Sequence, residues 1–125
     1  MSESTEQKAV ISWFNIQYPK LRGCLFSNCN GAVLSGGKVA RAIQMNRLKA
    51  EGLKCGVSDL FLAVPVNGFA GLWIEMKDIK KKISDVSPAQ QAHIDQMIKM
   101  GYGAVWCAGA KQAIDTINGY LNGVR

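Results

Sequence analysis

Two neighbouring segments near the middle of the chain, residues 59–66 and 72–77, have apolar residues at every second position. Because the side chains of a β-strand point alternately to its two faces, the alternation predicts two strands. Asn67-Gly68, followed by Gly71, supplies the turn of a β-hairpin between them. One face of this hairpin is wholly apolar and is expected to lie in the core: Leu60, Leu62, Val64, Leu72, Ile74 and Met76.

The other face of the predicted hairpin carries charge. Glu75 and Lys77 are two residues apart and share that face, and antiparallel pairing brings Asp59 beside them. Two carboxylates about 4 Å apart repel by ~4 kcal/mol at an effective dielectric near 20, so a cation is the simplest partner. Mg²⁺ prefers oxygen ligands and fits, with Lys77 facing the same phosphate. The alternative is a surface ion pair between Glu75 and Lys77, worth ~0–1 kcal/mol.

Helical spacing of apolar residues predicts a helix at the start of the chain. Ser4 is the expected N-cap, with Gln7 as its capping-box partner, and the helix ends at Tyr18 because Pro19 follows. An extended segment is expected over residues 20–30.

Three further helices and one strand follow from the same spacing. A helix with a basic face is predicted for residues 38–51, and Ser87 and Pro88 begin another. Residues 104–108 form an apolar run typical of a short buried strand, and residues 111–121 have the spacing of a closing helix. The economical architecture for this order is α/β, with a mixed β-sheet flanked by helices.

Two polar residues fall on inward faces of the predicted helices. Glu6 lies one turn before Val10 on the apolar stripe, which makes it a candidate third acidic group; alternatively, it only favours the macrodipole of the first helical turn. Gln90 lies four residues before Ile94, where its amide could hold a water or a phosphate oxygen. His93 is expected to be exposed or half-buried and without a role.

The length of the chain indicates the number of domains, and its net charge indicates the kind of partner. The 125 residues fit one domain, residues 1–125, and the net charge of +6 favours an acidic polymer as partner. Basic side chains gather in the second helix and after the hairpin, although such residues can also simply be solvated. The candidates for nucleic-acid contact are Lys38, Arg41, Arg47, Lys80, Lys81 and Lys82.

The four cysteines give no sign of a metal site or of a secreted fold. They form no C-x-x-C pair and have one histidine to accompany them, so zinc is poorly supported and reduced, buried thiols are expected. Residues 1–8 are polar rather than a basic leader before an apolar run, and no segment reaches the length of a membrane span. These features favour a protein of the cytoplasm that does not bind membranes.

Several short sequences resemble the VRR-NUC family, the virus-type replication-repair nucleases of the PD-(D/E)xK superfamily. They are residues 52–60, GLKCGVSDL, then 71–77, GLWIEMK, then 87–90, SPAQ, and the break at Gly101-Tyr102. The resemblance implies a restriction-endonuclease-like core and extends from Glu6 to about Leu121. One departure is plain: Ser58 stands where the superfamily motif has proline, which removes a φ constraint and no ligand.

The resemblance also implies a role for each site residue. Asp59 and Glu75 match the metal-binding carboxylates, Lys77 the catalytic lysine and Glu6 an acidic residue of the first helix. The backbone carbonyl of Met76 is expected to complete the metal shell. Gln90 matches a glutamine of the site, and the Asn30-Gly31 pair matches an upstream element near the DNA.

The implied activity is hydrolysis of phosphodiester bonds with Mg²⁺ or Mn²⁺ and no organic cofactor, in a bacterial or phage-infected cell. Lys77 is cast as an electrostatic stabiliser. Small members of the family resemble nucleases of branched DNA, so four-way (Holliday) junctions are the expected substrate, and cutting two junction strands symmetrically requires a homodimer. The first helix could supply part of the dimer interface or belong to the core. Flaps, linear duplex, or nucleic-acid binding without catalysis are the alternatives.

Overall fold

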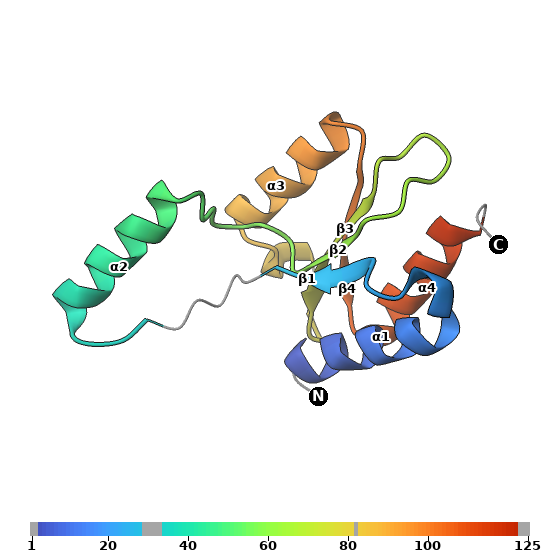
Figure 1. Cartoon of the computed structure of the whole chain (residues 1–125), viewed down its shortest axis with the longest axis horizontal. Helices are drawn as coiled ribbons and strands as arrows, with labels where there is room; N and C mark the ends of the chain where they lie inside the picture. The colour runs from blue at the N-terminus through green and yellow to red at the C-terminus, as the bar shows by residue number, and fades with distance from the viewer. Residues whose placement is uncertain (1–2, 29–33, 82, 123–125) are drawn as a thin grey trace.

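A four-stranded mixed sheet forms the centre of the computed structural model, which describes residues 3–28, 34–81 and 83–122 (Figure 1). Its strands lie in chain order: β1 (Leu25–Ser27), β2 (Leu60–Leu62), β3 (Leu72–Lys77) and β4 (Gly103–Ala108). The first three pair antiparallel, whereas β3 and β4 pair parallel across a helical crossover. The predicted α/β architecture with a mixed sheet is therefore confirmed.

Helices cover both faces of the sheet. The apolar face packs against α1 (Glu3–Gln17) and α4 (Ala110–Leu121), which also contact each other, and α3 (Pro88–Lys99) packs on the other face over β3 and β4. Two short 3-10 turns, η1 (Pro19–Leu21) and η2 (Ile83–Asp85), complete the elements. The face that carries Glu75 thus looks toward α3.

The core is the one that the hairpin pattern predicts. Leu60, Leu62, Val64, Leu72, Ile74 and Met76 are all buried. They pack with Val10 and Phe14 of α1 and with Ala113, Ile117 and Leu121 of α4. The sequence left open whether the first helix belongs to a dimer interface or to the core, and Val10 and Phe14 are core residues, while Ile16 is exposed.

The predicted boundaries need correction at two places. The first hairpin strand covers Leu60–Leu62 rather than residues 59–66, because Pro65 has no N–H to pair and the chain widens into a loop before the turn. The turn itself has the expected geometry, with positive φ at Asn67 and Gly68. Ser4 lies inside α1 and is not its cap, since the helix begins at least one residue earlier.

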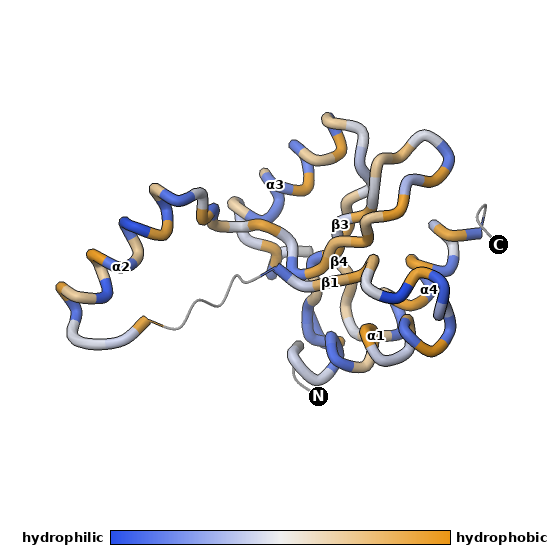
Figure 2. The backbone as a smooth tube through the Cα atoms, in the orientation of Figure 1, coloured by the Kyte–Doolittle hydropathy of each residue, from blue (hydrophilic) through white to orange (hydrophobic). Residues whose placement is uncertain are grey.

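The second helix, α2 (Lys38–Ala50), differs from the other three because it stands away from the sheet (Figure 1). Its apolar residues Val39 and Ile43 are 74% and 64% exposed. Apolar and polar residues follow one another along it, as Figure 2 shows. Periodicity correctly predicted the helix, but it could not tell whether another element covers its apolar side.

The burial of the cysteines only partly agrees with the sequence prediction. Of the described cysteines, Cys107 is buried and Cys24 half-buried, but Cys55 is exposed, so the expectation of buried thiols is wrong there. Cys29 lies outside the described residues. No helix in the described part of the chain is long and apolar enough to cross a membrane.

Candidate active site

The register of the hairpin sets the position of Asp59. Leu60 pairs with Ile74, so Asp59 continues the strand opposite Glu75. The Asp59 carboxylate also turns back to the partner strand, where its Oδ2 accepts a hydrogen bond of 2.8 Å from the Met76 N–H. The predicted meeting of Asp59 with the end of β3 is therefore confirmed, and one carboxylate oxygen is committed to fixing its direction.

This hydrogen bond also indicates where the backbone carbonyl of Met76 points. In an extended strand the N–H and C=O of one residue point to the same neighbour. Since the Met76 N–H points to Asp59, its carbonyl oxygen faces that side too. The start of β2 at Leu60 leaves no strand pairing for it there, which suits the role expected for this carbonyl.

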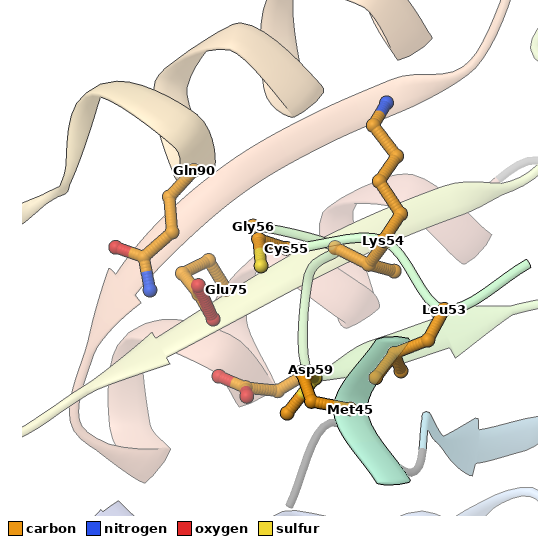
Figure 3. A pocket seen from close by; sticks show the side chains of 9 residues that line it. Met45, Leu53, Lys54, Cys55, Gly56, Asp59, Glu75 and Gln90 are labelled. Carbon is orange, nitrogen blue, oxygen red and sulfur yellow. The ribbon is translucent and has the colours of Figure 1, made fainter. Parts of the chain in front are cut away.

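Asp59, Glu75 and Gln90 line one cavity of about 290 Å³. In Figure 3 the Asp59 carboxylate just before β2, the Glu75 carboxylate of β3 and the Gln90 amide of α3 converge on one side of it. The Glu75 side chain is 2% exposed. Two carboxylates that share a site repel each other when both are charged, so the cavity is suited to a cation.

The first turn of α3 fixes the direction of Gln90. Ser87 is its N-cap, as predicted, and its Oγ accepts a bond of 3.1 Å from the Gln90 N–H. In return, the Oε1 of the Gln90 side chain accepts a hydrogen bond of 2.9 Å from the Ser87 N–H. Because the oxygen is used in this capping box, Gln90 presents its Nε2 donors to the cavity.

Asn28, which sequence analysis did not single out, holds the segment that carries Asp59. Its backbone N–H donates to the Asp59 carbonyl at 2.9 Å, and its Nδ2 donates to the Ser58 carbonyl at 2.9 Å. Ser58, which stands where the superfamily motif has proline, is buried next to these two hydrogen bonds. An asparagine at the end of a short strand is too common a pattern to have predicted the contact.

A second wall of the cavity is the loop of residues 53–57. Gly56 has φ of +86°, and a Cβ placed there would lie 2.5 Å from the carbonyl carbon and oxygen of Ala89. Only glycine therefore lets this loop meet the start of α3. Cys55 lies in the wall, and the Lys54 amine points away from the carboxylates (Figure 3), donating to Gln96 Oε1 at 2.9 Å.

Glu6 and Lys77 lie outside this cavity. Lys77 is half-buried on the same face of β3 as Glu75, one step further along the strand. Glu6 is buried on the α1 side, and its Oε2 accepts from the Ala110 N–H at 2.7 Å at the start of α4. Within the described ranges, no three His, Cys, Asp or Glu side chains gather closely enough to hold a metal ion. The metal role of Glu6 stays a prediction, and its observed contact is with a helix end.

The basic residues predicted to contact nucleic acid are exposed wherever they are described. Lys38, Arg41 and Arg47 lie on α2, and Lys80 and Lys81 follow β3. Met45 of the same helix lines the cavity, so α2 leads toward the site. Asn30 and Lys82 lie outside the described residues. A role in binding stays a prediction for all of them.

His93 is buried, not exposed or half-buried as expected. Its ring packs edge-on against Trp73, with 5.0 Å between the centroids. Burial, and after it the charge of Lys54, lowers the pKa of His93 from its ordinary value. The periodicity of α3 could not predict this burial, because the surface that covers His93 is Trp73, a residue of β3 on the same face as Glu75.

Comparisons with known proteins agree on one family. The family model described as VRR-NUC domain matches residues 1–111. A solved structure titled "VRR_NUC domain protein" superposes with a TM-score of 0.81 at 25% sequence identity, covering 98% of this chain and 90% of that one. No curated protein sequence matches this chain.

Proposed function

The chain belongs to the VRR-NUC family of nucleases, and from this premise we propose that it is an endonuclease that hydrolyses phosphodiester bonds in branched DNA with Mg²⁺ or Mn²⁺. Four-way junctions are the proposed substrate. The observation that carries the proposal is the cavity in which Asp59, Glu75 and Gln90 converge, with Lys77 next along the same strand face.

The residues present fit a hard divalent ion. Two carboxylates and the Met76 carbonyl offer oxygen ligands, which Mg²⁺ and Mn²⁺ prefer, and no histidine is among the described residues that line the cavity. When bound, the metal would neutralise charge on the phosphate and make water a better nucleophile.

Each protein group then has a task of its own. Asp59 keeps one carboxylate oxygen on the Met76 N–H, so the other is directed into the cavity. The Nε2 donors of Gln90 are placed to hold a phosphate oxygen or the attacking water. Lys77 supplies a positive charge beside the phosphate, and such fixed charge is worth most where negative charge develops in the transition state.

Branched DNA fits the charge and size of the protein. The net charge of +6 and the exposed lysines and arginines of α2 favour a polyanion. The described part of the chain brings Asp59, Glu75 and Gln90 together in one cavity, so two symmetrical cuts require two copies related by a two-fold axis. The proposal therefore includes a homodimer, which solution mass measured with and without DNA would test.

A panel of end-labelled DNAs tests the proposed function most directly: a four-way junction, a flap, linear duplex and single strand, each with Mg²⁺, Mn²⁺ or EDTA. We expect cleavage of the junction first and none with EDTA. Asp59→Asn, Glu75→Gln and Lys77→Met should abolish cleavage while binding persists. Asp59→Asn keeps an acceptor for the Met76 N–H, so the fold is preserved.

Asp95→Asn is the matched control, since Asp95 is an exposed acidic residue of α3 whose contact is with Gln91. It should leave cleavage unchanged. If no DNA is cut with either metal, the enzyme proposal is wrong and a binding module remains. Equal cutting of linear duplex would remove the preference for branched DNA.

A further inference from the structure

A second hollow, of about 370 Å³, lies along α1 next to the end of β1. It is lined by Ser4, Gln7, Lys8, Ile11, Ser12 and Ser27. These residues include three hydroxyls, an amide and an ammonium, and none of the six is acidic. The polar side chains at its rim, those of Ser4, Lys8, Ser12 and Ser27, are exposed. The hollow therefore offers hydrogen-bond donors and one positive charge to a ligand from solvent.

The donors on α1 form a row. Ser4, Lys8 and Ser12 are spaced by four residues, so they stack on one face of the helix. The rise between neighbours in the row is ~6 Å. A row of alternating hydroxyl and ammonium groups at this interval suits an extended ligand with regularly spaced negative charges better than a single compact anion.

The hollow and the catalytic cavity open on opposite faces of the sheet and approach each other at the end of β1. Ser27 pairs with Leu60, the residue after Asp59. The next residue, Asn28, donates both of its hydrogen bonds to the Ser58-Asp59 backbone. Because adjacent strands lie ~4.8 Å apart, the Ser27 edge of the hollow lies beside the backbone segment that carries Asp59, round the end of the sheet from its carboxylate.

We propose that this hollow is a subsite for the sugar-phosphate backbone, a few nucleotides from the bond that is cut. The proposal rests on the proposed function of the neighbouring cavity. Serine, glutamine and lysine side chains are typical phosphate contacts, and such contacts set the position of a strand without reading its sequence. The row on α1 thus holds the DNA strand where it passes round the end of β1 toward Asp59, while α2 lies on the other side of the cavity.

The test compares DNA binding by Lys8→Ala and by Lys8→Ala/Ser12→Ala, each in an Asp59→Asn background that prevents cutting. Lys99→Ala is the matched control, because Lys99 is an exposed lysine in the last turn of α3, next to the turn that contacts the tip of the hairpin. Loss of one phosphate contact should lower the slope of log K against log salt by about 0.9. Lys99→Ala should leave the slope unchanged.

Methylphosphonate linkages, which carry no charge, locate the contact. Placed one at a time around the cut site of the junction, they should weaken binding by the parent protein at one or two linkages on one side. Lys8→Ala should show no further loss at those linkages. An unchanged salt slope, or equal losses in parent and variant, would overturn the subsite even if the wild-type protein still cuts the junction. Absence of all cutting by wild type would refute the proposed function instead.

Discussion

Gly56 is the residue at which a single added methyl group should separate the walls of the cavity that Asp59, Glu75 and Gln90 line. Its φ of +86° lies in the left-handed region, and an added Cβ would meet the Ala89 carbonyl group at 2.5 Å. The atoms in the way belong to backbone, so no side-chain rotation can relieve the contact. Gly56→Ala must therefore move the loop of residues 53–57 or the first turn of α3.

The cost has two parts that a control can separate. Alanine in the left-handed region costs about 1–2 kcal/mol. Overpacking against a fixed group costs about 1–3 kcal/mol more, for a total of about 2–5 kcal/mol. Gly23 has a matching φ of +92° but no heavy atom within 4 Å of its added Cβ, so Gly23→Ala should show only the first part.

Urea denaturation followed by tryptophan fluorescence measures both variants. At a slope of about 2 kcal/mol per M urea, the midpoint of Gly56→Ala should fall by about 1 M or more, and that of Gly23→Ala by less. Gly56→Ala should also cut the junction at least about 100-fold more slowly, because displacement of site groups by about 1 Å has effects of that size. Equal midpoints for the two variants would refute the reasoning.

Three further predictions concern residues that support the site. Asn28→Ala removes the side-chain donor to the Ser58 carbonyl and should lower the free energy of unfolding by about 1 kcal/mol. It should also slow junction cleavage by more than this loss of stability explains, which a lowered kcat with an unchanged Kd for the junction would show. Glu6→Ala leaves the Ala110 N–H without its acceptor and should destabilise by about 1–3 kcal/mol, whereas Glu6→Gln should retain stability, and a raised Mg²⁺ requirement in Glu6→Gln would support a metal role for Glu6. Because the fold lowers the pKa of His93, the unfolded chain takes up a proton before the folded chain does as the pH falls through about 6.5. The free energy of unfolding should therefore be greatest above that pH and decline below it. His93→Leu should flatten this decline, as urea midpoints measured between about pH 5 and pH 8 would show.

Local patterns predicted the parts of the site that local physics determines. Strand alternation and the Asn67-Gly68 turn set the hairpin register, which brings Asp59 to Met76 and Glu75. Ser87 and Gln90 are three residues apart, and their capping box needs no distant partner. These features were predictable because every interacting group lies within a turn or a hairpin.

The features that were missed depend on residues distant in sequence. Asn28 reaches a segment 30 residues away, and Gly56 is required because Ala89 happens to lie against it. The burial of His93 depends on Trp73, and the exposure of α2 depends on the lack of a covering element among the described residues. Periodicity describes one element at a time, so it cannot supply such contacts.

The hydrogen bond between Glu6 and Ala110 joins residues 104 positions apart. It has a consequence for biosynthesis, because α1 leaves the ribosome well before its partner α4. Asp59 and Met76, by contrast, are 17 residues apart and can meet as soon as the hairpin has emerged. The end of the hairpin that carries Asp59 can thus form co-translationally, while the contact between α1 and α4 must wait for Ala110. A ribosome stalled before Ala110 would expose to chaperones the apolar surface of α1 and the sheet that α4 covers.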